Sequence, residues 1–337
     1  LVKNARLCYT VNKSSKKEWS DKEKTMATKK AKTIEAAFQE YLAEHNLTGP
    51  ISQKQHEEAF ERFMDKQGMD FLMQEVLGDM DDDLQMAYEA ENSEEALKYA
   101  KRALKKNPRS VDAETLIAQC QAKSEDDLQS RYRKILAKEE KNLKNDGIWE
   151  EENIGSFWLI AATRPYMRLC DVYVDSLVAS RKFRKAAEEC EKMLRLCEND
   201  NLGVRYRLAH IYAYLEEEAA LQRLQQRYEN EDSTMFLLPL CVLYYKLDDL
   251  KTAASYLAKL FRINPDCKLI FRNADWEKIE NAIDEALDEV TEVGGYRPAS
   301  LGEFLLAIEE EDYLYDAATS FWTWAMQQCK KTERTKK

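Results

Sequence analysis

The chain has 337 residues, of which only 9 are Gly and 6 are Pro. Average usage would give roughly 24 Gly and 17 Pro, and β-sandwiches and barrels depend on the turns that these residues form. The composition therefore excludes the all-β architectures. Hydrophobic residues make up 44% of the chain, which is enough to bury a sizeable core.

Charge is distributed unevenly. The formal net charge is −11, but residues 1–33 hold ten basic and three acidic residues, and residues 330–337 hold five and one. The body between them therefore has a formal charge of −22. Because nucleic-acid affinity depends on clustered Lys and Arg that neutralise phosphates, this body repels nucleic acid. Such a role would have to use the tails, and we predict no nucleic-acid partner.

Cysteine and histidine indicate neither a metal site nor a disulfide framework. The 8 Cys include no CxxC pair, and the 3 His are not spaced i, i+4. We therefore expect reduced core cysteines, no metal and no cofactor. The chain has no run of 18 apolar residues, and its basic N-terminal stretch lacks a continuous apolar segment. These features predict a cytoplasmic protein that has no membrane partner.

The N-terminal part divides into a tail and a hairpin. Residues 1–33 are rich in Lys and predict a flexible basic tail. The stretch from Met26, MATKKAKT, is typical of a bacterial start, so we expect residues 1–25 to be upstream sequence. Residues 34–78 show helical periodicity that Thr48-Gly49-Pro50 interrupts, which predicts an N-terminal helical hairpin.

An internal repeat is the strongest signal in the sequence. Small residues recur at spacings of four and three in the segments Ala96–Pro108, Ala186–Glu198 and Ala253–Pro265. Ala186 and Ala253 are 67 residues apart, close to two units of about 34 residues. Ala219 and Ala220 lie at the midpoint of that interval. Small side chains let two antiparallel helices approach closely, and Pro ends the second helix. This pattern resembles the tetratricopeptide repeat.

A second resemblance is narrower. The stretch GSFWLIAATRPYMR at 155–168, followed by NDNLGVRY at 199–206, is similar to bacterial tetratricopeptide proteins. These are related to the repeat region of the suppressor-of-tumorigenicity seven family. The resemblance covers about residues 80–330, with its specific part in 153–206. Ser156 and Ala162 replace a His and a Glu common in the bacterial relatives, so any binding role of those residues is lost or altered here.

The resemblance implies an all-α fold, a right-handed α–α superhelix of antiparallel helix pairs with helical N- and C-terminal caps. Its predicted parts are a first repeat-like unit with a charged helix at 79–145, a repeat-like core at 146–293, a C-terminal helical hairpin at 294–329 and a basic tail at 330–337. Pro239 is the one proline expected inside a helix. Further residues expected in the core are Trp158, Tyr173, Tyr244, Phe261, Cys170, Cys190 and Cys241. His210 is expected in the core or at the edge of the groove.

No catalytic motif is present. The patterns GxSxG, GxxxxGK[ST], GxGxxG and HExxH do not occur. Acidic clusters such as Glu150–Glu152 usually only solvate exposed helix faces. Two carboxylates beside Trp158 could still act as general acid and base, so a hydrolase on an α-superhelical scaffold stays open as an alternative. We nevertheless predict a non-catalytic protein.

Function is expected from the concave groove, which the first helix of each repeat lines. Arg suits carboxylates and Tyr offers flat contact area, so the groove would accept a peptide or a partner's helix. Two alternatives remain: Arg205 and Asp171 merely pair between neighbouring repeats, or the aromatic C-terminal hairpin mediates self-association. The predicted peptide-binding residues are Arg164, Arg168, Asp171, Asp175, Asn201, Arg205, Tyr212, Tyr245 and Lys246.

Overall fold

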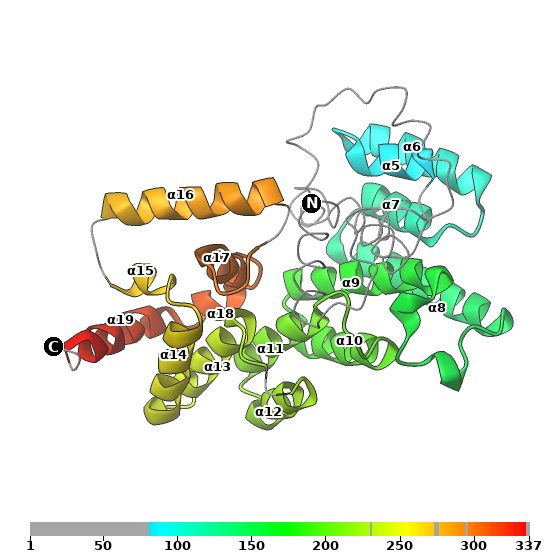
Figure 1. Ribbon diagram of the computed structural model, residues 1–337. Helices are drawn as coiled ribbons and strands as arrows, with labels where there is room; N and C mark the ends of the chain where they lie inside the picture. Colours follow the sequence, from blue (N-terminus) through cyan, green and yellow to red (C-terminus); the bar gives the residue numbers. More distant parts are fainter. Residues whose placement is uncertain (1–80, 230, 273–275, 294–295, 335–337) are drawn as a thin grey trace, which may run out of the picture. The chain divides into compact units, whose positions relative to one another are not determined.

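The computed structural model describes residues 81–229, 231–272, 276–293 and 296–334. Every secondary-structure element assigned within these ranges is a helix, which confirms the all-α class (Figure 1). The chain forms two compact units, and their described parts are residues 81–108 and the described residues from Arg109 onwards. The basic tail predicted at 1–33 and the hairpin predicted at 34–78 lie outside the described residues.

The first compact unit contains the antiparallel pair α5 (Asp82–Glu89) and α6 (Ser93–Lys106). Asp83 is buried and forms ion pairs with Arg102 at 3.0 Å and with Lys106 at 2.6 Å. These pairs join the first helix to the second, because a buried carboxylate needs a cationic partner.

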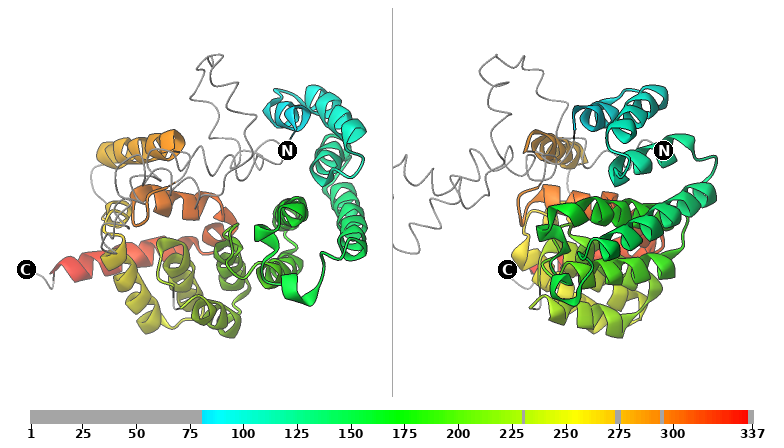
Figure 2. Two further views of the ribbon diagram at one scale, coloured as in Figure 1. Left: turned by 45° about the vertical axis from the view of Figure 1, so that its right-hand side comes forward. Right: turned by 90° about the vertical axis from the view of Figure 1, so that its right-hand side faces the viewer.

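The second compact unit continues with helix pairs. Neighbouring helices pack as α7 with α8, α9 with α10, α11 with α12 and α13 with α14, and each pair contacts the next (Figures 1 and 2). Three short 3-10 helices connect α8 to α9. The α-helices are α7 (Val111–Gln121), α8 (Glu125–Asn145), α9 (Arg164–Ala179), α10 (Phe183–Leu196), α11 (Val204–Leu215), α12 (Glu218–Arg227), α13 (Thr234–Lys246), α14 (Leu250–Ile263), α15 (Lys268–Phe271), α16 (Trp276–Val293), α17 (Leu301–Glu309), α18 (Asp312–Asp316) and α19 (Thr319–Arg334).

The small residues of the internal repeat lie at close helix contacts. Ala186 and Cys190 on α10 and Ala253 on α14 are completely buried. The midpoint repeat differs, because Ala219 on α12 is exposed and Leu221 makes the buried contact instead. Small buried side chains let helices approach closely, which explains why the spacing could be detected in the sequence.

The residues predicted for the core are buried. His210 and the three cysteines are at most 1% exposed, and the four aromatic residues are at most 7% exposed. Pro239 lies inside α13, as predicted. This helix is buried on every side from Thr234 to Tyr244, so neighbouring segments must cover all its faces.

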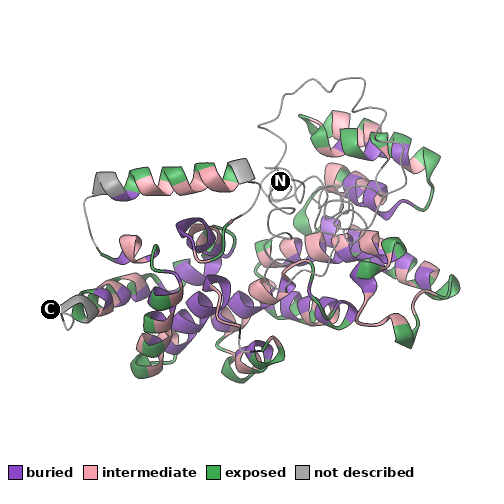
Figure 3. Ribbon diagram, viewed as in Figure 1, coloured by how far each residue is buried: buried purple, intermediate pink, exposed green. Residues whose placement is uncertain are grey.

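The C-terminal segment supplies part of that cover. The segment predicted as a two-helix hairpin contains three helices, α17, α18 and α19. α17 packs on α13, and α18 packs on both α11 and α13. Figure 3 colours α13 and α17 mostly as buried. The side chains Phe304, Leu314 and Phe321 are completely buried. The C-terminal segment therefore covers the face of α11 and α13 on which the sequence predicts a peptide groove.

Candidate functional site

Two predicted groove residues meet at an arginine that the sequence analysis missed. Arg207 of α11 pairs with Asp171 at 3.1 Å and Asp175 at 2.7 Å on α9, and with Glu311 at 3.4 Å just before α18. The helical phase predicted from the sequence placed Arg205 on this face. An error of two positions rotates a helical residue by about 200°, so Arg207 points where Arg205 was expected.

The burial and charges of this cluster indicate a structural role, as a joint between the helices and the C-terminal segment. Burial raises the pKa of Asp175 to about 6 and the pKa of Glu311 to about 8, although the positive charge of Arg207 opposes both shifts. One Oε atom of Glu311 is buried without a hydrogen bond. The carboxylates converge on a guanidinium, so this cluster binds the C-terminal segment to α9 and α11.

His210 strengthens the same joint. Its Nδ1 lies 2.8 Å from the carbonyl oxygen of Tyr206, and its Nε2 lies 2.8 Å from the hydroxyl of Tyr315 on α18. Burial lowers the pKa of His210 to about 4, so the ring is neutral near pH 7. Of the two positions expected for His210, the core and the groove edge, it occupies the core.

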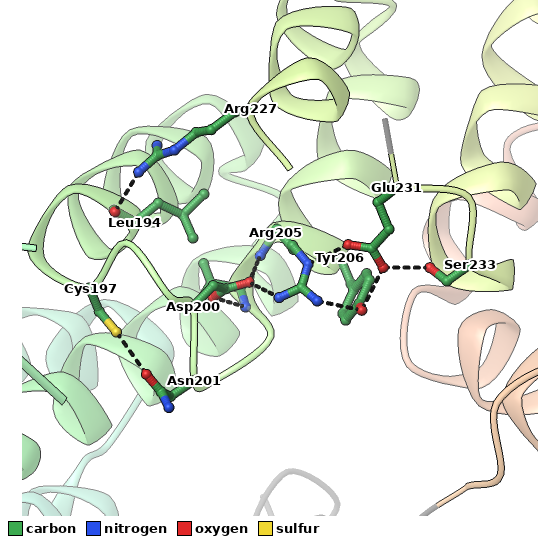
Figure 4. A network of polar contacts seen from close by, with 10 residues as sticks. Leu194, Cys197, Asp200, Asn201, Arg205, Tyr206, Arg227, Glu231 and Ser233 are labelled. Atoms are coloured by element: carbon green, nitrogen blue, oxygen red, sulfur yellow. Dashed lines mark hydrogen bonds and ion pairs between the residues drawn. The ribbon is translucent and has the colours of Figure 1, made fainter. Parts of the chain in front are cut away.

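Arg205 belongs to a different network, between α11 and the loop before α13 (Figure 4). It donates to Glu231 at 2.6 Å, to Asp200 at 3.0 Å and to the hydroxyl of Tyr206 at 2.6 Å. Asp200 also accepts the backbone N–H groups of Val204 and Arg205 at the start of α11, at 2.7 and 2.9 Å. Arg205 and Asp171 therefore each pair with a neighbouring element, but not with one another.

The remaining basic groove residues also serve internal contacts. Arg168 forms a two-point ion pair with Asp112 of α7, at 3.0 and 2.6 Å. Arg164 donates to the carbonyl oxygen of Trp158 at 2.9 Å. Lys246 donates to the last carbonyl groups of α11, at Ala213 and Tyr214. Such contacts hold neighbouring helices in register.

The three other predicted residues lie apart from one another. Asn201 accepts a hydrogen bond from the thiol of Cys197 at 3.3 Å (Figure 4). The hydroxyl of Tyr245 donates to Ser320 of α19 at 2.9 Å. The hydroxyl of Tyr212 donates to Glu191 of α10 at 2.6 Å. The nine predicted residues thus do not form one surface, and Tyr212 alone among them lines a surface hollow described below.

Two adjoining hollows form a furrow along α10, α11 and α12, called here the α10–α12 furrow. They share Arg184 and Leu215, are open to solvent, and have volumes of about 480 and 460 Å³. The first is lined by Arg184, Ala187, Glu188, Glu191, Arg195, Tyr212, Leu215, Glu217 and Ala220. The second is lined by Arg181, Lys182, Phe183, Arg184, Lys185, Tyr214 and Leu215. This is the candidate binding surface, and the run RKFRK at 181–185 is the sequence signal that could have indicated it.

The structure also places the residues that the sequence suggested for catalysis and for self-association. Glu150–Glu152 are exposed, whereas Trp158 is buried. Phe321 is completely buried and Trp322 stacks on Phe271 within the chain. Across the described ranges, no group of three or more His, Cys, Asp or Glu side chains is arranged to hold a metal ion. Likewise, none of the helices described has the length and apolarity needed to cross a membrane.

Comparison of the chain with protein-family models, characterised proteins and solved structures gives no match. The resemblance to tetratricopeptide proteins therefore remains a prediction from the sequence.

Proposed function

We propose that the chain is a non-catalytic, cytoplasmic protein-binding scaffold, built as a right-handed solenoid of tetratricopeptide-like helix pairs. The observation that carries this proposal is the α10–α12 furrow. It is open to solvent, and its lining combines Arg and Glu side chains with Tyr212. Small-molecule sites are usually enclosed and mostly apolar, whereas an open furrow with mixed charges and a tyrosine suits an extended peptide.

The binding surface proposed differs from the groove expected in the sequence, because the C-terminal segment covers α11 and α13. Phe304, Tyr313, Leu314 and Phe321 are each at most 2% exposed. Burying one such side chain contributes about 1.5–3 kcal/mol, so exposing all four costs roughly 6–12 kcal/mol. That is comparable with the whole stability of a typical domain, about 5–15 kcal/mol. A partner would have to unfold this segment to reach the covered face, so we assign binding to the furrow.

The experiment fills the furrow without changing the fold. Ala220 on α12 lines the furrow, and the adjacent Ala219 is exposed and lies outside it. We expect a displayed random-peptide library to yield sequences that bind the native chain and Ala219→Phe, but not Ala220→Phe. Circular dichroism checks that both variants remain helical. Selection of the same peptides by all three proteins, or enrichment of none, would contradict the proposal.

A further inference from the structure

The strongest local concentration of positive charge among the described residues borders the furrow. The basic turn, residues 181–185 with the sequence RKFRK, runs from the link after α9 into the first turn of α10, and four of its five residues are basic. Arg181, Arg184 and Lys185 are exposed. The body of the chain has a formal charge of −22, so this patch opposes the charge of its surroundings.

Internal partners neutralise only part of the patch. Lys182 pairs with Asp126 at 2.6 Å and donates to Gln129 at 2.7 Å. Arg184 pairs with Glu217 at 3.0 Å, but their side chains are 74% and 42% exposed, so the pair contributes little. Arg181 and Lys185 form no ion pair with any residue that the structure describes. Two positive charges therefore remain available to a partner.

The backbone shape of this turn does not require basic residues. The corresponding turn between α13 and α14 has the same backbone shape, with Asp248 at φ 60° where Arg181 has φ 58°. The next residue there, Asp249, accepts the N–H of Thr252 and caps α14. Lys182 in the same position provides no cap for α10. Basic side chains at the start of a helix also oppose its dipole, so the charges of the basic turn are unfavourable for α10 by themselves.

An aromatic surface lies beside these charges. Tyr214 and Leu215, which are partly exposed, line the hollow that contains the basic turn, together with the buried Phe183. The ring of Phe183 packs against Tyr214 at 4.3 Å and against the buried Tyr313 at 4.6 Å. These contacts make the floor rigid. An apolar or aromatic side chain can pack on such a floor while neighbouring carboxylates meet Arg181 and Lys185.

We infer that the hollow of the α10–α12 furrow that the basic turn lines binds an acidic segment of another protein, one that carries an aromatic or large apolar residue between its carboxylates. The other hollow, which Glu188, Glu191 and Glu217 line, does not meet these carboxylates. This inference rests on the proposed function and adds the class of partner. Charge complementarity supports a short acidic peptide, which contacts only the basic turn. A long polyanion such as nucleic acid would extend over the acidic body and be repelled.

The test measures binding of short fluorescein-labelled peptides that carry one central Trp flanked by Glu, by Gln or by Lys. The test variant is Arg181→Asp with Lys185→Glu, since Asp248 shows that the turn accepts Asp and an acidic residue suits the first turn of α10. The control variant is Lys251→Glu with Arg262→Glu on α14, where both residues are exposed. Both variants change the formal charge by the same amount.

We expect the Glu peptide to bind at least about tenfold more tightly than the Gln and Lys peptides, and to weaken as ionic strength rises. The test variant should lose this preference, and the control should keep it. Equal affinity for the Glu and Gln peptides, unaffected by the test variant, would overturn the inference and leave the proposed function standing. Failure of all three peptides to bind would count against both.

Two further outcomes would also overturn the inference. Tighter binding of a single-stranded oligonucleotide, lost in the test variant, would assign the basic turn to nucleic acid. Concentration-dependent self-association in sedimentation, abolished by the test variant, would assign it to a second copy of the chain.

Discussion

The helix pairs α9–α10 and α13–α14 share a design but differ in burial. Each pair turns through a residue with positive φ and continues with a helix that has a completely buried alanine. In α13, every residue from Thr234 to Tyr244 is buried, whereas only half of α9 is. The α13 turn is acidic and capped, and the α9 turn is basic and uncapped.

The difference between the two turns shows which side chains stabilise the fold and which do not. The turn of α13–α14 optimises local stability, because Asp tolerates positive φ and caps the next helix. The basic turn carries an arginine at positive φ and gives up the cap. Residues that lower local stability without a compensating structural contact are typical of functional surfaces. We therefore regard α9–α10 as the candidate binding pair and α13–α14 as the core pair.

The largest expected effect concerns α17, which packs on α13 of the core pair. Phe304 of α17 is completely buried, and its ring lies 5.7 Å from that of Phe271. Because truncation leaves a cavity, we expect Phe304→Ala to lower the free energy of unfolding by about 3–5 kcal/mol. Urea unfolding followed by circular dichroism measures this. Leu250→Ala, at a residue that is 41% exposed, is the control and should change stability by less than about 0.5 kcal/mol. A similar small loss for Phe304→Ala would show that α17 is not part of the core.

The second prediction concerns the joint between α9, α11 and the C-terminal segment. The pKa of Asp175 is raised to about 6 and that of Glu311 to about 8. Both exceed the usual values near 4, so the folded chain binds more protons than the unfolded chain between about pH 4 and pH 8. The contribution of these groups to the free energy of unfolding is therefore full below about pH 4 and is lost as the pH rises through that window.

Glu311→Gln stays neutral at every pH, so it should flatten this decline. We expect it to stabilise the chain by roughly 1–3 kcal/mol near pH 9, where the native carboxylate is charged and one oxygen is buried without a hydrogen bond. Urea unfolding at a series of pH values measures the slope. Glu309→Gln, at an exposed residue, is the control. An unchanged slope in Glu311→Gln would show that Glu311 does not titrate in this range.

The third prediction tests the cap of the acidic turn. Asp249 accepts the backbone N–H of Thr252 at 3.0 Å. Loss of this cap in Asp249→Ala should cost about 1 kcal/mol, and Asp249→Asn should retain most of it. Thermal unfolding of both variants measures the difference. Equal stability of the Ala and Asn variants would remove the cap as a distinction between the two turns.

The smallest effect is expected at the positive-φ residues themselves. Gly adopts this conformation without steric cost, so Arg181→Gly should raise the free energy of unfolding by about 0.5–1 kcal/mol. Asp248→Gly should gain less, because Asp tolerates positive φ better than Arg does. Chemical unfolding of the two variants in parallel gives the comparison. A larger gain at Asp248 would mean that Arg181 is not the less favourable of the two residues.

Local spacing explains which parts were predictable. The small residues of α6, α10 and α14 recur within one helix each, so their pattern is visible in sequence and indicated the helix contacts correctly. The neighbours Ile211 and Tyr212 similarly predicted His210 in the core or at the groove edge, and it lies in the core. The binding face was harder, since the choice between Arg205 and Arg207 depends on the helical phase of α11, which its apolar residues do not define sharply.

The features that the sequence did not predict depend on contacts between distant parts of the chain. Arg207 meets Glu311 across 104 positions of sequence, and no periodicity signals such a pair. Tyr245 similarly contacts Ser320 of α19 across 75 positions. Contacts of this kind decide that the C-terminal segment covers α11 and α13, and hence that the face predicted as a groove is occupied.

The sequence by itself determined the helical class and the core positions, because scarce Gly and Pro and the spacing of small residues act within single helices. Only the tertiary structure decided which helix faces are covered and which surface is open. That outcome depends on how distant segments bury apolar area against one another, and the gain in burial outweighs the local preferences that a sequence displays.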